Sequence, residues 1–353
     1  MNYFALSARI LAGLSLSLFL PLACAAELVG FREITVADAS GQRPLHVALW
    51  YPTATASPFL VSAENPVFEG LPAVKDASPA PAAHPLVVLS HGYRGNWRNL
   101  SWLVTSLVGQ GYVVAAPDHP GTTTFDRRPA EAAKLWERPR DVSRVIDTLS
   151  ADKSLAGAVD LQRIAVIGHS LGGWTATALA GARYSPQRFL EECRLHPNPR
   201  LCGLAPELGI APANEGALGV DLRDPRIKAI VALDPGLVRG FTPQSLSTVQ
   251  TPTLVLGAGV NIAGMPVEEE SGYLGTHLPA ATSSLRVIAD ASHFSFMQLC
   301  KPGAPTLLRE DDPEDEVICR DGDQRSREAI HQQVAQLIGG FLERSLTSQP
   351  PGQ

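Results

Sequence analysis

A short run in the middle of the chain constrains the fold more than any other feature. The apolar segment Arg163–Gly168 is followed by His169-Ser170-Leu171-Gly172-Gly173, which has the pattern G-x-S-x-G. In this pattern a buried strand turns sharply into a helix, and the serine is held at the turn in a strained conformation. Bulky side chains at Gly168 or Gly172 would collide with the adjoining strand and helix. The run therefore predicts a strand, a sharp turn at Ser170 and a helix.

Short apolar runs alternate with amphipathic stretches on both sides of this turn. That alternation is typical of an α/β fold, a mostly parallel sheet with helices on both faces. The segment 53–84, rich in Ala, Pro and Ser, is expected to be a surface loop. Strands are expected at 28–36, 45–51, 85–90, 112–117, 163–168, 227–233, 253–257 and 285–289, the first two as an antiparallel edge. Helices are expected at 100–110, 140–149, 170–181 and around the apolar face of Ile330, Val334, Leu337 and Phe341.

The composition suits one large domain. The chain has 353 residues, 45% of them hydrophobic, which is enough to bury a sizeable core. The stretch Ser78-Pro79-Ala80-Pro81 could be an interdomain linker, but Leu45–Tyr51 before it could not form a domain alone, so we expect a single domain over 26–353. The segments 183–226 and 301–325 interrupt the alternation. Long insertions of this kind often form lids or the walls of a site, so both are predicted to be lid-like.

The N-terminus has the pattern of an export signal. Ile10–Leu22 is an almost unbroken apolar run, with Arg9 before it and the small residues Ala23-Cys24-Ala25-Ala26 after it. The run is too short to cross a bilayer comfortably, and it fits a signal peptide over 1–25, cleaved after Ala25. We therefore expect a periplasmic or secreted protein. A lipoprotein anchored at Cys24, in contact with a membrane surface, and a buried first helix are the alternatives.

Cysteine spacing agrees with export. Without the signal, four cysteines remain in two sequence-local pairs. We predict the disulfides Cys193–Cys202 and Cys300–Cys319 in an oxidising compartment. Four buried free thiols in a cytosolic protein are the alternative. Zinc fits poorly, since no CxxC pair or close His/Cys set is present.

The charge pattern gives no sign of nucleic-acid binding. Lys plus Arg is 29 and Asp plus Glu is 35, so the net charge is −6, and no basic block stands out. The acidic segment Asp311–Asp323 does not have the spacing of a calcium-binding loop, and a solvated loop is expected there. We expect no cofactor and no metal.

The strand–turn–helix pattern around Ser170 is known as a nucleophile elbow, and its serine is the candidate nucleophile. A serine hydroxyl needs a base, and for this elbow the chain order is Ser, then Asp or Glu, then His. His293 follows the last expected strand, in a loop that can carry an imidazole over Ser170, and it is the predicted base. His277 lies in a segment flanked by Gly and Thr, and His331 lies in the C-terminal helix pattern, so both are less suitable.

The predicted acid is Asp234. It ends the apolar strand Ile230–Leu233, at the sheet edge where ligands collect in open α/β folds. Its role would be to hold the tautomer of His293 and stabilise the imidazolium. The alternative interpretation of Asp234 is a helix or turn cap before Pro235. Asp290 is too close to His293 in sequence, and the carboxylates of 268–270 are expected to be solvated.

Two backbone N–H groups are expected to bind an oxyanion. One belongs to Tyr93, in the loop after the early buried strand, and the other to Leu171, directly after the nucleophile. His169 is interpreted as a packing or turn residue. Trp97, Trp102 and Trp174 are candidate walls of a substrate pocket, with an ordinary place in the core as the alternative.

Together these segments resemble a known family. His91-Gly92-Tyr93-Arg94-Gly95, Arg163–Gly173, Ala232-Leu233-Asp234-Pro235 and Ser292-His293-Phe294 are similar to the platelet-activating-factor acetylhydrolase-like α/β-hydrolases, whose bacterial members are often named predicted dienelactone hydrolases. The resemblance covers roughly 46–297. It implies an α/β-hydrolase fold, the triad Ser170, Asp234 and His293, and the oxyanion donors Tyr93 and Leu171.

The resemblance also implies an activity. The family hydrolyses short-chain or truncated esters without calcium, including phospholipid acyl groups and sometimes polyesters. Leu171 stands where the family commonly has phenylalanine, and the two cysteine-bearing insertions lie outside the shared pattern. True dienelactone hydrolases have a cysteine in the elbow, so Ser170 argues against that activity.

The leading hypothesis is an exported serine esterase that works through an acyl-enzyme on a small-molecule or lipid ester. A peptidase or an acyltransferase on the same fold is the alternative among enzymes, because both use the same triad. A catalytically silent binding module is the alternative outside enzymes. The complete set of Ser170, Asp234 and His293 weighs against it.

Overall fold

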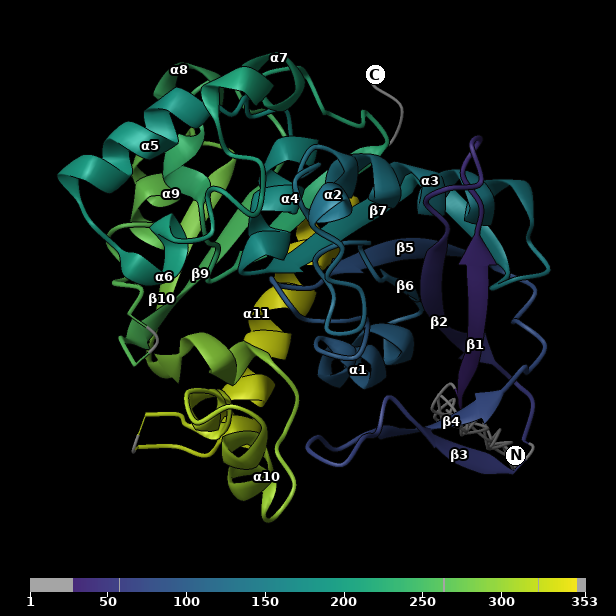
Figure 1. Cartoon of the computed structure of the whole chain (residues 1–353). Helices are drawn as coiled ribbons and strands as arrows, with labels where there is room; N and C mark the ends of the chain where they lie inside the picture. The colour runs from purple at the N-terminus through teal and green to yellow at the C-terminus, as the bar shows by residue number, and fades with distance from the viewer. Residues whose placement is uncertain (1–27, 57, 263, 323, 348–353) are drawn as a thin grey trace, which may run out of the picture.

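The computed structural model describes residues 28–56, 58–262, 264–322 and 324–347 (Figure 1). The predicted signal peptide 1–25, with the alternative lipid anchor at Cys24, lies outside the described residues. None of the helices within the described ranges is long and apolar enough to cross a bilayer.

A ten-stranded sheet forms the centre of the molecule, with the strand order β10-β9-β8-β7-β5-β6-β2-β1-β4-β3. The six strands from β10 to β6 in that order are parallel, and β2 joins them antiparallel. The sheet is therefore mostly parallel, as expected. The strands are β1 (Leu28–Val36), β2 (Leu45–Thr53), β3 (Phe59–Ser62), β4 (Leu71–Lys75), β5 (Ala83–Ser90), β6 (Val113–Pro117), β7 (Ala158–His169), β8 (Ile227–Leu233), β9 (Thr253–Val260) and β10 (Ser283–Ser292).

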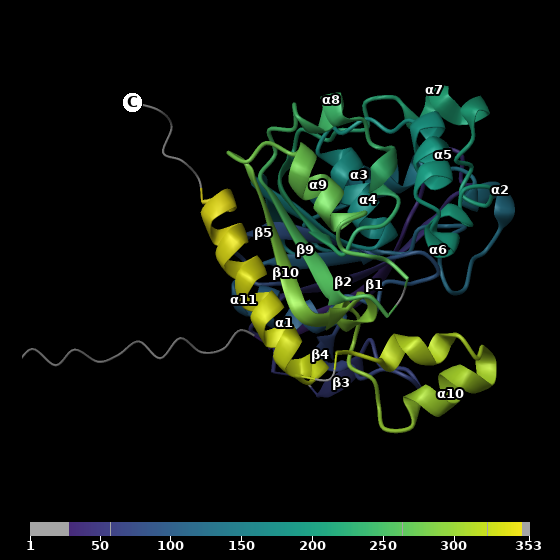
Figure 2. The same cartoon turned by 90° about the vertical axis from the view of Figure 1, so that its left-hand side faces the viewer.

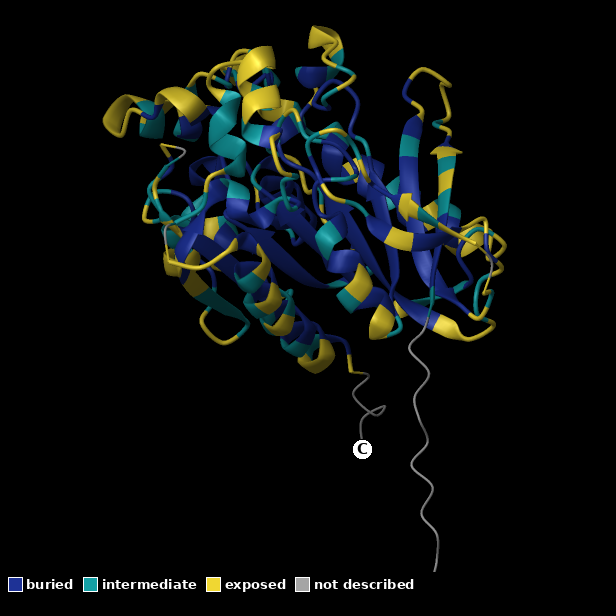
Figure 3. Ribbon diagram, turned by 90° about the horizontal axis from the view of Figure 1, so that it is seen from below, coloured by how far each residue is buried: buried dark blue, intermediate teal, exposed yellow. Residues whose placement is uncertain are grey.

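Helices cover both faces of the sheet (Figure 2). The helices α1 (Val104–Gly109) and α11 (Arg327–Leu346) pack on one face, and α3 (Glu137–Ala151), α4 (Leu171–Leu179) and α9 (Ser271–His277) lie on the other. Side chains alternate between two cores along each strand, because successive residues point to opposite faces. In β7, Ile164 and Val166 enter one core while Ala165 and Ile167 enter the other. Figure 3 shows the central strands of the sheet as buried, with exposed positions mostly on loops and outer helices.

The remaining helical elements are short and lie in connections. They are η1 (Ser101–Leu103), α2 (Pro129–Ala132), α5 (Pro186–Leu195), α6 (Pro199–Cys202), η2 (Pro212–Asn214), α7 (Glu215–Leu218), η3 (Val238–Gly240), α8 (Pro243–Leu246), η4 (His293–Phe296), α10 (Ala304–Asp311) and η5 (Asp315–Cys319).

The expectation of a loop over 53–84 is wrong in part. The strands β3 and β4 lie within it and form an antiparallel pair that joins the sheet beside β1. The pair β1 and β2 is antiparallel as expected, but it lies inside the sheet, and β3 is the edge strand. Pro72 interrupts the apolar alternation of β4, so the local pattern is weak. Pairing with β1, which no local pattern encodes, stabilises the strand.

The two insertions contain the disulfides. The segment 183–226 carries α5, α6 and α7, and the bridge Cys193–Cys202 joins α5 to α6 with a Cα–Cα distance of 5.7 Å. The segment 301–325 carries α10 and η5, and the bridge Cys300–Cys319 ties it to the chain after η4 with a Cα–Cα distance of 5.9 Å. Both pairs are those expected from the sequence. Figure 1 shows α6 and α10 on the same side of the molecule, one on each side of the ends of β9 and β10.

Candidate active site

Ser170 occupies a strained turn between β7 and α4. Its φ is 55° and its ψ is −118°, a backbone region that non-glycine residues rarely adopt. The Ser170 N–H donates to the Leu233 carbonyl at 3.0 Å, and the N–H groups of Gly173 and Gly236 donate to the Ser170 carbonyl at 2.8 and 3.1 Å. These hydrogen bonds attach the turn to the end of the neighbouring strand β8 and hold the strained conformation.

The two glycines of the elbow leave no room for a side chain. A Cβ atom on Gly168 would lie 1.9 Å from the Gly172 carbonyl oxygen, and one on Gly172 would lie 1.9 Å from the Ser90 carbonyl oxygen. Because the colliding atoms belong to the backbone, neither clash could be relieved by a side-chain rotation. The structure thus gives the reason for glycine at both positions of the motif.

Asp234 lies at the end of β8 and is hydrogen-bonded through both carboxylate oxygens. Its Oδ1 accepts from the Ala258 N–H at 2.9 Å and from the Ser271 hydroxyl at 3.2 Å. Its Oδ2 accepts from Nδ1 of His293 at 2.7 Å. Asp234 is 3% exposed, so the three donors replace the water that an ionised carboxylate would otherwise bind.

His293 begins η4, directly after β10. Its Nδ1 is the proton donor to Asp234, which leaves Nε2 as the free lone pair of a neutral ring. The structure therefore brings Asp234 and His293 into direct contact. Ser170 lies at the end of the strand next to that of Asp234, and among the described residues no hydrogen bond joins its hydroxyl to His293.

The peptide between Gly92 and Tyr93 has a fixed orientation. Nε2 of His91 accepts from the His119 backbone N–H at 3.0 Å, so the ring proton is on Nδ1, which donates to the Gly92 carbonyl at 2.7 Å. The Gly95 N–H donates to the same carbonyl at 3.1 Å. In a trans peptide the N–H points away from the carbonyl, so the Tyr93 N–H faces away from this turn.

The same peptide lies beside the serine. A Cβ atom on Gly92 would be 3.1 Å from Cβ of Ser170. The second expected donor, the Leu171 N–H, belongs to the first residue of α4, where a helix leaves its N–H groups without an internal partner. Both expected oxyanion donors are therefore in segments adjoining Ser170.

Gly236 lies between the serine hydroxyl and two apolar side chains. A Cβ atom on Gly236 would lie 3.7 Å from Ser170 Oγ, 3.2 Å from Leu201 Cδ2 and 3.6 Å from Met265 Cε. Leu201 comes from α6 in the first insertion, and Asn198 at the start of that helix donates to the Gly264 carbonyl at 2.8 Å. The first insertion and the loop after β9 thus meet beside the serine hydroxyl.

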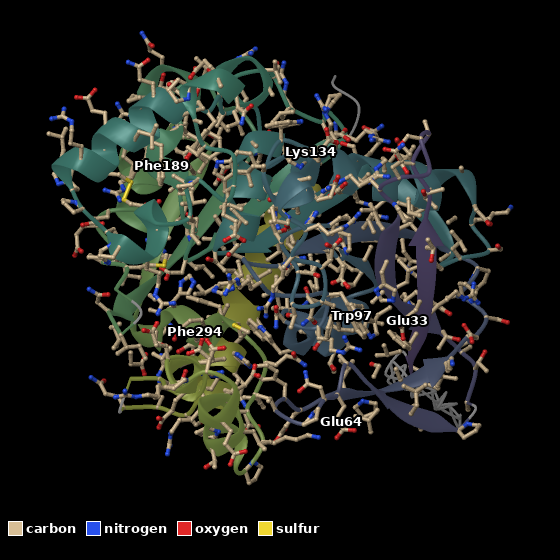
Figure 4. The ribbon with its side chains drawn as sticks, viewed as in Figure 1. Glu33, Glu64, Trp97, Lys134, Phe189 and Phe294 are labelled. Carbon is tan, nitrogen blue, oxygen red and sulfur yellow. A yellow bond between two sulfur atoms is a disulfide. The ribbon has the colours of Figure 1, made fainter. Side chains whose placement is uncertain are left out.

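The first insertion also contributes to the rim of the site. The Arg200 guanidinium lies 6.0 Å from the ring centre of Phe294, which Figure 4 labels near the junction of the insertions. Arg94, in the loop that carries Tyr93, lies 3.9 Å from Glu207 of the first insertion. Partial burial and the neighbouring Glu207 raise the pKa of Tyr93 to about 12, so its phenol stays neutral at physiological pH. The rim therefore combines aromatic rings with charges of both signs.

The chain is similar to a known family of proteins. The model of the Alpha/beta hydrolase family matches residues 87–343.

The chain belongs to the alpha/beta hydrolase family.

Several proteins are similar to this α/β hydrolase. It is 26% identical over 211 residues to a bis(hydroxyethyl) terephthalate hydrolase of Streptomyces coelicolor, covering 59% of this chain and 50% of the relative. It is 24% identical over 212 residues to a cutinase of Thermobifida alba, covering 59% of this chain and 53% of the relative. The chain spans about half the length of these relatives.

A solved structure supports the fold over most of the chain. The ferulic acid esterase from Streptomyces cinnamoneus superimposes with a TM-score of 0.64 at 23% sequence identity, over 93% of this chain and 92% of the other. At that identity the likeness establishes the α/β-hydrolase fold.

The prediction that three tryptophans wall a substrate pocket is wrong. Trp174 of this α/β hydrolase is completely buried against Tyr184 and Phe241, and Trp97 packs against Phe31 and Trp50 in the other core. Trp102 stacks on His331 at 3.8 Å and lines a separate cavity of about 530 Å³. Large aromatic rings gain free energy from close packing, which explains the burial of Trp97 and Trp174; the partly buried Trp102 lines a cavity, but not one beside Ser170.

Glu270 is also placed differently from the expectation of a solvated run at 268–270. It is 2% exposed and accepts hydrogen bonds from the Val238 N–H and from Nε of Arg239, at 2.7 and 3.0 Å. Burial raises the pKa of Glu270 to about 7 despite these donors. Together with Ser271, it attaches α9 to the loop that follows Asp234. A run of three carboxylates gives no sequence signal that one member turns inward.

The residues considered as alternatives to Asp234 and His293 have other hydrogen-bond partners in the α/β hydrolase. Asp290 forms two hydrogen bonds with the Arg325 guanidinium, each 2.6 Å long. The ring of His277 is bonded to the Tyr273 carbonyl within α9, and that of His331 to the Ser295 carbonyl. None of the three has a described contact with Ser170 or Asp234.

Proposed function

We propose that this α/β hydrolase is an exported serine hydrolase that cleaves carboxylic esters. The observation that carries the proposal is the 2.7 Å hydrogen bond from His293 to Asp234, made at strand ends next to the strained turn of Ser170. A nucleophile at an elbow and a base oriented by a buried carboxylate are the parts that acyl transfer needs.

The chemistry would proceed in two halves. Ser170 Oγ attacks the ester carbonyl while Nε2 of His293 accepts its proton, and the carbonyl oxygen becomes an oxyanion that the Tyr93 and Leu171 N–H groups bind. The tetrahedral intermediate collapses, and His293 returns the proton to the leaving alcohol. Water then repeats the sequence on the acyl-enzyme and releases the acid. Asp234 keeps the proton on Nδ1 and stabilises the imidazolium.

We propose short acyl groups as the preferred acid part of the substrate. Leu201 and Met265 bound the space beside Ser170 Oγ, which supports a small acyl group. The names of the similar proteins, a bis(hydroxyethyl) terephthalate hydrolase and cutinases, support ester cleavage and add aromatic and polymeric esters to the candidates. The resemblance to acetylhydrolases of truncated phospholipids makes lipid esters a further candidate class.

Export is part of the proposal. The apolar run Ile10–Leu22 and the small residues after it support a signal peptide. The disulfides Cys193–Cys202 and Cys300–Cys319 support an oxidising compartment, since such bonds are rare in the cytosol.

A labelling experiment combined with a substrate panel tests the function. A fluorophosphonate probe should label Ser170, and the Ser170→Ala variant should lose labelling and about 10⁵- to 10⁶-fold of turnover. The panel contains p-nitrophenyl esters of increasing acyl length, bis(hydroxyethyl) terephthalate and a phospholipid with a short acyl chain. Activity should survive EDTA. A folded wild-type chain that neither reacts with the probe nor cleaves any ester would overturn the proposal.

A further inference from the structure

Arg138 differs from the other buried arginines. Four arginines are buried in the described parts of the chain, and three of them, Arg43, Arg239 and Arg327, have a carboxylate oxygen within 4.0 Å. Arg138 is 1% exposed and has none. A buried cation without a counterion is costly, so its hydrogen bonds must compensate for the lost water.

The guanidinium of Arg138 is bound by uncharged oxygens from several segments. Nε donates to Oγ1 of Thr175 at 3.0 Å, and Nη1 donates to Oγ1 of Thr122 at 2.6 Å. Nη2 donates to the carbonyl of His91 and, at 3.3 Å, to Oγ of Ser90. All of these acceptors are neutral. The planar geometry of the guanidinium group, more than charge pairing, therefore determines which segments Arg138 joins.

Two of these partners belong to the segments that carry the proposed oxyanion donors. The His91 carbonyl begins the peptide before Gly92, and the next peptide carries the Tyr93 N–H. On the other side, Thr175 is one turn into α4, and its hydroxyl also donates to the Leu171 carbonyl at 3.1 Å. We infer that Arg138 is a positioning residue that bridges the two halves of the oxyanion hole and fixes the spacing between their N–H groups.

The location of Arg138 supports a role other than helix stability. It is the second residue of α3, and the N-terminus of a helix disfavours a cation because of the helix dipole. Burial lowers the pKa of Arg138 to about 9, yet the group stays charged at neutral pH. The nearby carboxylate of Asp141 is bonded to Arg43 and His119 instead. Nothing in α3 itself requires an arginine at this position.

The inference rests on the proposed function, and its test compares variants with an active wild type. Arg138→Lys keeps the positive charge but removes the planar guanidinium that donates in several fixed directions. We expect its kcat on p-nitrophenyl acetate to fall about 10- to 100-fold with KM within threefold, since loss of a whole oxyanion donor costs about 10²- to 10³-fold. Phenylboronic acid, which forms a tetrahedral adduct with the serine, should bind more weakly by the same factor. Inhibition by acetate, the planar product, should not change.

Arg226→Lys is the control, because Arg226 also binds its partner through a planar guanidinium, donating from Nε and Nη2 to Asp224 just before β8, and it is bonded to neither half of the oxyanion hole. It should keep wild-type kcat, and its melting temperature gives the cost of losing such a guanidinium. The inference is overturned if folded Arg138→Lys keeps its kcat, if boronate and acetate weaken together, or if Arg226→Lys loses as much kcat.

A second variant covers the case in which Arg138→Lys does not fold. Thr175→Val removes only the α4 end of the bridge, and it should lower kcat and boronate affinity together by about three- to tenfold with acetate inhibition unchanged. Unchanged kcat in this variant overturns the bridge. A wild-type chain without esterase activity or boronate binding would instead overturn the proposed function, so the two failures are distinct.

Discussion

Nε2 of His169 is 2.9 Å from the backbone carbonyl of His293, and the two imidazole rings lie 4.6 Å apart. The carbonyl can only accept, so the proton of His169 is on Nε2. Burial, followed by the effect of the adjacent His293 imidazole, holds the pKa of His169 well below its usual value, and the His169 ring stays neutral. The residue before the proposed nucleophile thus anchors the loop of the proposed base, a role beyond the packing or turn residue expected from the sequence.

Replacing His169 with phenylalanine should slow the reaction without unfolding the protein. The ring shape is kept, but the hydrogen bond to the His293 carbonyl is lost, so the base is held less well. We expect kcat to fall about 10- to 100-fold, the range for a small misplacement of a catalytic group. Steady-state kinetics and melting temperature measure this. His277→Phe is the control, because the His277 ring is bonded to the Tyr273 carbonyl within α9 and, in the described residues, has no hydrogen bond to Ser170, Asp234 or His293. It should leave kcat unchanged; an equal loss there would contradict the assignment.

The identity of the acid can be tested by a matched pair of amide variants. Asp234→Asn should lower turnover about 10⁴-fold, because an amide favours the wrong tautomer of His293. Asp290→Asn removes a carboxylate of similar burial that is bonded to Arg325 instead, and its kcat should stay within threefold. The reverse outcome would move the acid to Asp290.

His331 predicts a specific dependence of stability on pH. Burial and the nearby Arg327 lower its pKa to about 3, from an ordinary value of 6.5. Below pH 6.5 the unfolded chain binds a proton that the folded chain does not, so stability is lost as the pH falls from 6.5 toward 3. In His331→Gln, the slope of the unfolding free energy against pH should be smaller than in the wild type by about 0.7 kcal/mol per pH unit at pH 6.5 and by about 1.4 near pH 5.

His46 is the control with the opposite sign. Hydrogen bonding to Asp118 and to Glu33 raises its pKa. Its contribution is therefore complete at low pH and is lost as the pH rises through the raised value. Denaturant unfolding at several pH values should show opposite changes of slope in His46→Gln and His331→Gln, and parallel curves for both variants would contradict the prediction.

Gly236→Ala should narrow the acyl side of the site. The new methyl group would lie 3.7 Å from Ser170 Oγ and 3.2 Å from Leu201 Cδ2, in the space proposed for the acyl chain. We expect kcat/KM for p-nitrophenyl butyrate to fall about tenfold more than for the acetate, as one methyl group in an apolar pocket is worth about 10- to 200-fold. Gly216→Ala, with nothing near its Cβ, should leave the ratio unchanged. Equal losses on both esters would place the acyl group elsewhere.

The disulfide Cys300–Cys319 should matter for turnover as well as stability. The chain after Cys319 is bonded to the serines on each side of His293, since Oγ of Ser292 donates to the Arg320 carbonyl at 2.7 Å and Oγ of Ser295 donates to Asp321. Replacing both cysteines with serine should lower the unfolding free energy by about 3 kcal/mol and also lower kcat at temperatures where the core is folded. Unchanged kcat in the folded double variant would separate the second insertion from the base.

The sequence by itself determined those elements whose type can be read from a few consecutive residues. Arg163–Gly173 predicts strand, turn and helix because two glycines and an apolar run are readable over eleven consecutive residues. β8 has the predicted bounds Ile227–Leu233, because a strand buried on both faces is an unbroken apolar run. The order Ser170, Asp234, His293 follows from placing polar residues at the ends of such strands, and the pair Asp234 and His293 is indeed in contact.

Only the tertiary structure decided which polar side chains turn inward. Glu270 belongs to a run of three carboxylates, and nothing local marks it as the partner of Arg239. Arg138 resembles any arginine of an amphipathic helix until Thr175 and the His91 carbonyl, from distant parts of the chain, surround it. The tryptophans were misplaced for the same reason. Burial depends on which segments meet in space, whereas composition and spacing describe only neighbours in sequence.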